Sequence, residues 1–192
     1  MIVLAGGIGS GKSVVARILR LKGFGVFDCD YEARVLMETN KHLIQSIIDI
    51  AGDDVYSAGG KLNRQKLSAL IFNDIEIRDR INKVVHAAVR SEIVKWLKED
   101  PANIFVETAI AAESGLAGMA EQIWIVKASD ATRISRVMAR DGRSEENIKS
   151  IMHAQAEEED RMKKSNVLIK KINNDSSDMI LEEINRCFSK TI

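Results

Sequence analysis

Residues 6–13 have the types and spacing that phosphate binding requires. They read Gly6-Gly7-Ile8-Gly9-Ser10-Gly11-Lys12-Ser13, which fits the pattern G-x-x-x-x-G-K-S, and we call them the P-loop. Glycines let the backbone approach an anion closely, and successive N–H groups at a helix N-terminus then cradle phosphates. The pattern predicts that Lys12 reaches the terminal phosphates and that the Ser13 hydroxyl is a ligand of Mg²⁺. The sequence therefore predicts a site for a nucleoside triphosphate.

Three carboxylates follow apolar runs that we expect to be strands. Asp28 and Asp30 follow a short run, and Glu107 ends the run 103–106. Residues two apart on a strand face the same side, so Asp28 and Asp30 are expected to lie together. One of them could accept the proton of an attacking hydroxyl, and a carboxylate here could help to hold Mg²⁺. Alternatively, Asp30 caps a helix that begins at Tyr31, and Glu107 is a solvated strand end.

Four arginines are spaced by three, four and three residues: Arg133, Arg136, Arg140 and Arg143. This spacing predicts that they share one face of a helix beginning at Ser129. Guanidinium groups so close repel one another, and phosphoryl transfer needs such donors for the charge on the transferred group. A second helix, capped by Ser144, completes a hairpin suited to closing over the nucleotide as a lid. The alternative is a solvated basic helix, partly neutralised by the acidic residues 157–160.

An alternation of strands and helices must position these residues. The apolar run before the P-loop, the helical pattern after it and the next short strand predict an α/β fold. We expect a P-loop NTPase-type parallel sheet flanked by helices, with a helical acceptor-binding insertion and a helical lid. The predicted parts of this single domain are a core at about 1–30, 101–128 and 165–192, the insertion at about 31–98, and the lid at about 129–164.

Two smaller expectations concern helix ends and the core. Asn63 is the predicted cap of a helix within the insertion, and Ser177 is the predicted cap of the closing helix. Three methionines, Met138, Met152 and Met179, fall on apolar faces and are expected to belong to the core.

Composition limits the class of partner. The chain has 192 residues, and 28 Lys and Arg balance 28 Asp and Glu, so nothing in the charge indicates nucleic acid or a membrane surface. The two cysteines suit a reducing compartment. The first apolar run is too short for a signal peptide, and no run is long enough to span a bilayer. We therefore expect a cytoplasmic protein, and the sequence gives no indication of its oligomeric state.

With these pieces placed, the chain resembles the dephospho-CoA kinase family nearly from end to end. The resemblance rests on several segments besides the P-loop. They are Val26-Phe27-Asp28-Cys29-Asp30 with Ala33-Arg34, Asn63-Arg64 with Leu67 and Phe72, Ile81 to His86, Glu113-Ser114-Gly115-Leu116, and Arg133, Arg136 and Arg140-Asp141 with Gln155 downstream.

The resemblance implies a kinase that uses ATP and Mg²⁺ to phosphorylate the ribose 3′-hydroxyl of dephospho-CoA, the last step of coenzyme A synthesis. It implies that Asp30 is the general base and that Lys12 and Arg140 stabilise the transferring phosphoryl group. The expected nucleotide-binding residues are Gly9, Ser10, Gly11, Lys12, Ser13, Val14, Arg136 and Arg140. The expected acceptor-binding residues are Asp30, Arg64, His86 and Glu113. Ser13 is the expected metal ligand, with help from Asp28 or Glu107.

The chain departs from the family pattern at four places that bear on the acceptor pocket. They are Val14 for the usual Thr, Ala87 for the Pro after His86, Thr108–Ala112 for a Val-Pro-Leu-Leu segment, and Ser165-Asn166 for Ala-Asp. Two alternatives are therefore kept: another small-molecule kinase acting on a nucleoside or nucleotide, and a regulator that binds ATP without transferring phosphate. Retention of the phosphate-binding residues argues against the regulator.

Overall fold

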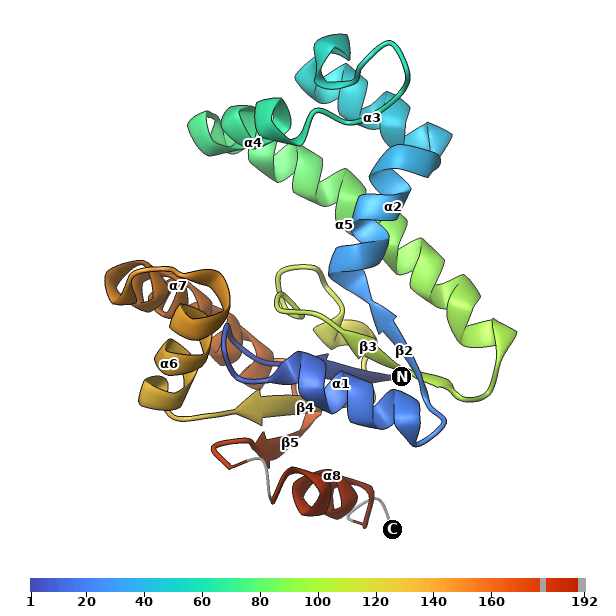
Figure 1. Ribbon diagram of the computed structural model, residues 1–192. Coiled ribbons are helices and arrows are strands. Elements are labelled where there is room, and N and C mark those ends of the chain that lie inside the picture. The colour runs from blue at the N-terminus through green and yellow to red at the C-terminus, as the bar shows by residue number, and fades with distance from the viewer. Residues whose placement is uncertain (177–178, 190–192) are drawn as a thin grey trace. The chain divides into compact units, whose positions relative to one another are not determined.

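The computed structural model describes residues 1–176 and 179–189, which form two compact units. The sheet unit comprises Met1–Phe27 with Leu97–Ile192, and the helical unit comprises Asp28–Trp96 (Figure 1). The predicted cap Ser177 lies outside the described residues. Within residues 1–176 and 179–189 we find no helix whose length and hydropathy would allow it to span a bilayer.

A five-stranded sheet organises the fold. Its strands are β1 (Ile2–Ala5), β2 (Gly25–Asp28), β3 (Asn103–Glu107), β4 (Gln122–Lys127) and β5 (Leu168–Asn173). Their order is β2-β3-β1-β4-β5, with β1 in the centre. β1 pairs in parallel with β3 and β4, and β4 pairs in parallel with β5. The predicted α/β class, a parallel sheet flanked by helices, is therefore confirmed.

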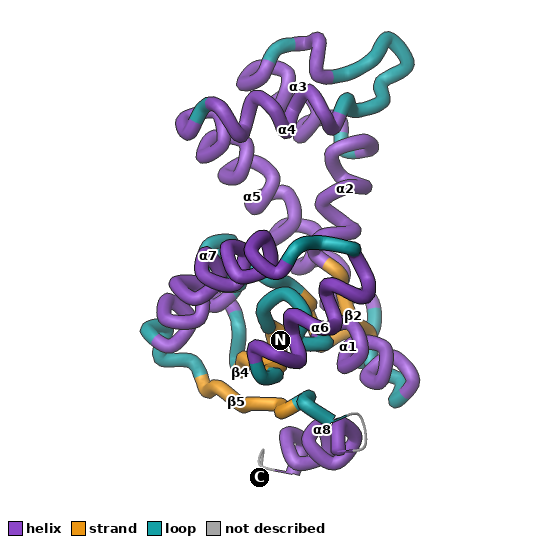
Figure 2. Tube along the Cα trace, turned by 60° about the vertical axis from the view of Figure 1, so that its left-hand side comes forward, coloured by secondary structure: helices purple, strands orange, loops and turns teal. Residues whose placement is uncertain are grey.

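The sheet unit also carries four helices among its described residues. They are α1 (Lys12–Leu21), α6 (Asp130–Asp141), α7 (Glu145–Lys163) and α8 (Ile180–Ser189), with a short 3₁₀ turn, η2, at Ala117–Met119. The predicted caps Ser129 and Ser144 are confirmed, because their side chains accept the N–H groups of Thr132 and Asn147. α6 and α7 form a hairpin (Figure 1), and α8 packs along β5 (Figure 2).

The core of the sheet unit fixes β1 and α1, the two elements that the P-loop joins. Leu4 of β1 and Val15 and Leu19 of α1 are fully buried. Behind them the rings of Phe105 and Trp124 meet edge to face, with their centroids 5.0 Å apart. Burial of such apolar area is the main stabilising term in folding, so the ends of the P-loop are held by buried core residues of the unit.

The helical unit consists of α2 (Cys29–Thr39), α3 (Lys41–Ala51), the 3₁₀ turn η1 (Asp53–Val55), α4 (Arg64–Asn73) and α5 (Ile75–Glu99), whose last residues extend into the sheet unit. The predicted cap Asn63 is confirmed, since its side chain accepts the Lys66 N–H. The core of the helical unit includes the buried side chains of Leu43, Ile47 and Ile81. Helices thus occupy most of the segment for which the sequence predicts helical periodicity.

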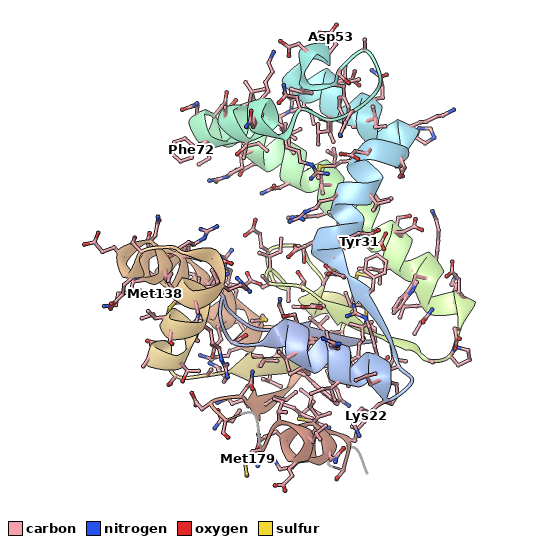
Figure 3. All side chains as sticks on the ribbon, viewed as in Figure 1. Lys22, Tyr31, Asp53, Phe72, Met138 and Met179 are labelled. Atoms are coloured by element: carbon pink, nitrogen blue, oxygen red, sulfur yellow. The ribbon has the colours of Figure 1, made fainter. Side chains whose placement is uncertain are left out.

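The prediction that the methionines belong to the core is wrong at two of the three positions. Met138 is 44% exposed and Met179 is 52% exposed, and both are labelled in Figure 3. α6 buries only Val137, so the neighbouring Met138 points away from the sheet. Met152 is half-buried and lines a pocket beside the P-loop.

Candidate functional site

The P-loop joins β1 to α1 and has the backbone that its glycines were expected to permit. Gly9 has φ +75° and Gly11 has φ +88°, both in the left-handed region. A Cβ atom on Gly9 would lie 2.6 Å from the carbonyl oxygen of Arg133, and one on Gly11 would lie 2.0 Å from Nδ2 of Asn174. Both positions therefore require glycine, for conformation and for space.

Three side chains from distant parts of the sheet unit hold the P-loop, and sequence analysis gave none of them this role. Arg133 Nε donates to the carbonyl oxygen of Ile8 (2.9 Å), and the Ile8 N–H donates to Gln155 Oε1 (2.7 Å). Asn174 Nδ2 donates to the carbonyl oxygen of Ser10 (2.8 Å). Arg133 and Gln155 were noticed in the sequence, but nothing local indicates that they bind this backbone.

Lys12 and Glu107 are brought together at the carboxyl end of the central strands. Lys12 Nζ lies 3.4 Å from Glu107 Oε1, and their side chains are 16% and 9% exposed. Glu107 is paired in register with Leu4, the residue before the end of β1, which explains its place beside the P-loop. The alternative that Glu107 is a solvated strand end is therefore wrong. A lysine beside a buried carboxylate can exchange that partner for a phosphate.

The arginines of the hairpin differ in their surroundings. Arg136 Nη1 is buried and has no hydrogen-bond partner among the described residues. Arg140 is exposed and forms two hydrogen bonds to Asp141, of 2.7 and 2.9 Å, which raise the pKa of Arg140 and lower that of Asp141. α6 ends at Asp141, and Gly142 follows with φ +65°, so Arg143 lies beyond the helix. The prediction of four arginines on one helical face is wrong at Arg143.

Asp28 and Asp30 lie where a strand passes directly into a helix. β2 ends at Asp28 and α2 begins at Cys29, so the two aspartates do not share a strand face, as the sequence had suggested. Asp28 is the cap of α2, because its Oδ1 accepts the N–H groups of Asp30 and Tyr31, both at 3.0 Å. The cap predicted at Asp30 is corrected accordingly. Asp30 is exposed, and its carboxylate has no hydrogen-bond partner within the described residues.

The other expected acceptor-binding residues occupy separate elements. In the helical unit, Arg64 Nη2 lies 3.0 Å from Glu38 Oε1 on α2, and His86 is half-buried on α5. In the sheet unit, Glu113 is exposed on the loop after β3, and its N–H donates to Glu158 Oε2 (3.3 Å).

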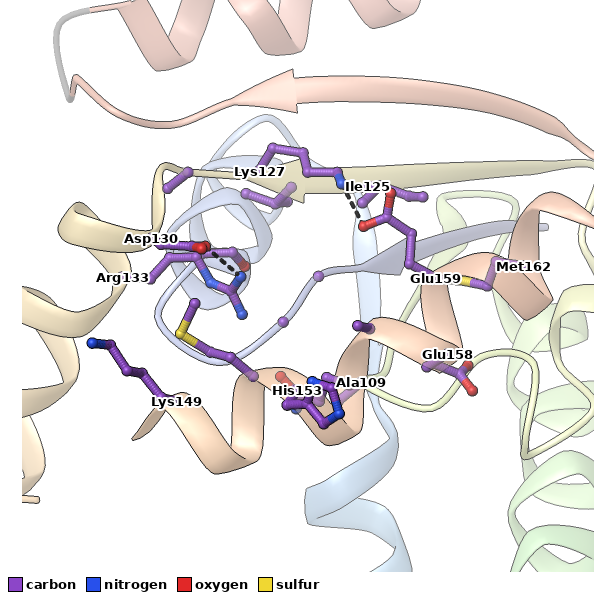
Figure 4. Close-up of a pocket in the computed structure, with 18 residues that line it drawn as sticks. Ala109, Ile125, Lys127, Asp130, Arg133, Lys149, His153, Glu158, Glu159 and Met162 are labelled. Atoms are coloured by element: carbon purple, nitrogen blue, oxygen red, sulfur yellow. Dashed lines mark hydrogen bonds and ion pairs between the residues drawn. The ribbon is translucent and has the colours of Figure 1, made fainter. Parts of the chain in front are cut away.

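A pocket of about 460 Å³ lies beside the P-loop within the sheet unit (Figure 4). Its walls come from the P-loop, the end of β4 and the α6–α7 hairpin. Two ion pairs cross its wall: Lys127 with Glu159, and Arg133 with Asp130 at 3.4 Å. The wall of the pocket thus combines charged side chains with apolar ones such as Ile125.

A glycine loop that leads from the central strand of a parallel sheet into a helix, with cations from a helical hairpin around it, defines the class of P-loop kinases. A family model described as Dephospho-CoA kinase matches residues 1–178. The dephospho-CoA kinase of Shouchella clausii is 32% identical over 192 residues, covering 98% of this chain and 96% of the relative. The chain belongs to the dephospho-CoA kinase family.

Two solved structures share the fold of this chain. The Thermus thermophilus protein TT1252 superposes with a TM-score of 0.80 at 31% identity, covering 100% of this chain and 97% of that one. The dephospho-CoA kinase from Campylobacter jejuni, at 21% identity, shares the fold with a TM-score of 0.68, covering 98% and 95% of the two chains.

Proposed function

We propose that this chain transfers the γ-phosphoryl group of ATP to the ribose 3′-hydroxyl of dephospho-CoA, giving coenzyme A. Family membership supports this reaction. One structural observation supports the binding of a phosphate group beside the P-loop. Arg136 Nη1 is buried without a partner, and a Cβ on Gly11 of the P-loop would lie 3.6 Å from it. A buried guanidinium nitrogen left unpaired is costly, and phosphate oxygens are the partners that guanidinium groups bind best.

For the nucleotide we propose the residues that the sequence indicated, residues 9–14 with Arg136 and Arg140. The N–H groups at the start of α1 point toward the P-loop and would bind phosphate oxygens. Lys12 would exchange its contact with Glu107 for the terminal phosphates. Arg140 would leave Asp141 to stabilise the charge on the transferring group.

The residues near the P-loop also fit Mg²⁺. Mg²⁺ keeps several waters and takes few protein ligands, chiefly carboxylate and hydroxyl oxygens. Ser13 in the first turn of α1 and the buried Glu107 would hold it, with Asp28 as the alternative carboxylate. When bound, the ion neutralises negative charge on the β- and γ-phosphate oxygens.

For the acceptor we propose Asp30 as general base, with Arg64, His86 and Glu113 as binding residues. The exposed carboxylate of Asp30, unpaired among the described residues, is available to accept the proton of the hydroxyl. The helical segment 31–98 would bind the CoA moiety, and the hairpin 129–164 would act as a lid. A small molecule in the cytoplasm, rather than nucleic acid or a membrane, is the substrate we propose, in keeping with the balanced charge and the two buried cysteines.

The test is ADP release from Mg-ATP with and without dephospho-CoA, with mass spectrometry and phosphorus NMR of the product. We expect strong stimulation and a new 3′-phosphate. Asp30→Asn should lower kcat by about 10²-fold or more, because general-base catalysis contributes on that scale, while ATP still binds. Asp49→Asn, at an exposed aspartate of α3, is the matched control.

Two outcomes would contradict the proposal. Unchanged turnover in Asp30→Asn would remove Asp30 as the base. Turnover of adenosine or AMP as fast as that of dephospho-CoA would indicate a nucleoside or nucleotide kinase instead.

A further inference from the structure

Glu158 of α7 is a buried carboxylate with an unusual set of partners. The residue is 5% exposed. Its Oε1 accepts the N–H of Ala112, and its Oε2 accepts the N–H of Glu113 at 3.3 Å. Within residues 1–176 and 179–189 no lysine or arginine pairs with it. Burying a carboxylate is costly, so the two consecutive main-chain N–H groups must be held firmly enough to offset that cost.

The loop that Glu158 binds is partly packed into the core, since Thr108, Ala111 and Ser114 are buried. Residues 108–112 carry three alanines, whose small side chains bury less apolar area than larger residues would. Hydrogen bonds within the loop, from Ser114 N–H to the Ile110 carbonyl (2.9 Å) and from Ala117 N–H to the Ala111 carbonyl (2.8 Å), define its shape. The Thr108 N–H donates to the Leu4 carbonyl (3.1 Å), which ties the start of the loop to β1. The two hydrogen bonds to Glu158 attach the loop to α7 at Ala112 and at Glu113 itself.

The same face of α7 also binds the P-loop. Gln155, one turn before Glu158, accepts the N–H of Ile8 at 2.7 Å. Glu159, the next residue, pairs with Lys127 at the end of β4 (Figure 4). One turn of α7 therefore binds both the P-loop and the loop that carries Glu113. Because the helix is rigid, it keeps the distance between these two loops constant.

We propose that Glu158 is a positioning residue that holds the main chain at Ala112 and Glu113 and thereby sets the affinity for the acceptor through Glu113. The role of Glu113 rests on the proposed function, whereas the anchoring by Glu158 does not. In this role Glu158 forms no covalent bond and transfers no proton. Glu158 acts by fixing where the Glu113 side chain starts.

Amide hydrogen exchange tests the anchoring without any reaction. In Glu158→Ala the Ala112 and Glu113 amides should exchange about tenfold faster or more, because each loses a buried charge-assisted hydrogen bond. Glu158→Gln keeps the side-chain shape and one acceptor oxygen, so it should give an intermediate rate and serves if the alanine variant does not fold. Glu157→Gln, at the exposed preceding residue, should change neither amide. Unchanged exchange in both Glu158 variants would overturn the proposal.

Kinetics test the second half of the proposal. Glu158→Gln should raise the KM for dephospho-CoA by about 5- to 50-fold, since small displacements of binding groups have effects of that size. The KM for ATP should stay within about twofold of the parent value, whereas simple loss of folded protein would lower the rate and move neither KM.

A double-mutant cycle with Glu113→Gln completes the experiment. If Glu158 acts through Glu113, Glu158→Gln should add little to the KM for dephospho-CoA in the Glu113→Gln background. An equal effect in both backgrounds would overturn the proposal. If the parent chain fails to phosphorylate dephospho-CoA at all, the proposed function is wrong, and the amide exchange rates still decide whether Glu158 anchors the loop.

Discussion

Gly11 and Gly23 have nearly the same backbone conformation in different surroundings. Their φ angles are +88° and +91°, both in the left-handed region. A Cβ on Gly11 would lie 2.0 Å from Asn174 Nδ2, whereas a Cβ on Gly23 would meet nothing within 4 Å. The pair therefore separates the cost of strained backbone from the cost of filling the P-loop.

We expect Gly11→Ala and Gly23→Ala to have different effects on ATP binding. Each change places a side chain in the left-handed region, at a cost of about 1–2 kcal/mol in stability. Only Gly11→Ala also displaces Asn174, and it should weaken ATP binding about tenfold or more, since overpacking forces the backbone to shift. Calorimetric titration with ATP measures the difference. Equal ATP affinity in the two variants would show that the contact with Asn174 does not matter for the P-loop.

Local sequence patterns predicted the residues whose partners lie within one turn, and missed those whose partners lie far along the chain. Ser129, Ser144 and Asn63 cap their helices as expected, because a cap binds an N–H three residues later. Gln155 and Asn174 support the P-loop from across the sheet unit, and a contact of that kind depends on the tertiary fold. No spacing rule in one sequence could have indicated it.

At the scale of elements, the junction of β2 and α2 explains why the two aspartates were interpreted incorrectly. The strand ends at Asp28 and the helix begins at the next residue, so no turn residue such as glycine or proline marks the boundary in the sequence. A pattern of period two therefore seemed to continue to Asp30. The structure instead makes Asp28 the cap and leaves the Asp30 carboxylate free of hydrogen-bond partners among the described residues, which suits the role proposed for it.

Two carboxylates, Glu92 on α5 and Asp28 at the start of α2, act electrostatically on Glu32 of α2. Burial, and then the negative charges of Glu92 and Asp28, raise the pKa of Glu32 above its usual value of 4.5. A carboxyl with a raised folded-state pKa favours folding below its unfolded-state pKa, and that contribution is lost as pH rises through the folded-state value. Ionised Glu32 should therefore destabilise the helical unit at neutral pH.

Glu32→Gln should accordingly raise the melting temperature at neutral pH, by an amount that shrinks as pH falls and vanishes below about 4.5. Glu76→Gln is the matched control, because Glu76 is also an acidic residue in the first turn of a helix, and it is exposed. Thermal melts of the three chains across this pH range make the measurement. A lower melting temperature of Glu32→Gln at neutral pH, with the difference vanishing toward acid pH, would mean that the pKa of Glu32 is lowered rather than raised.

At the scale of the molecule, the P-loop and all three side chains that hold it belong to the sheet unit. A ligand that binds the folded protein but not the unfolded chain stabilises the folded protein by mass action. Mg-ATP at 100 times its dissociation constant should add about 2.7 kcal/mol, which raises the melting temperature by about 5–10 °C for a chain of this size.

Arg136→Ala should reduce this shift while changing the melting temperature of the ligand-free protein little. Arg136 Nη1 has no partner to lose among the described residues, so its removal leaves no broken hydrogen bond. With ATP present, the variant lacks a donor to the phosphates. Differential scanning fluorimetry of both chains with and without Mg-ATP makes the comparison. A full shift in Arg136→Ala would show that this guanidinium does not contact the nucleotide.

The supports of the P-loop also have a consequence for folding during synthesis. Ile8 is bound by Arg133 and Gln155, 125 and 147 residues later, and Ser10 by Asn174, 164 residues later. Contacts between such distant residues form slowly, because a long loop must close first. The ribosome makes the chain from its N-terminus at about 5–20 residues per second. The P-loop is therefore synthesised well before Asn174, which follows β5 and binds Ser10. The nascent chain therefore completes the contacts that hold its P-loop late, after Asn174 has been made, although the P-loop itself is translated long before.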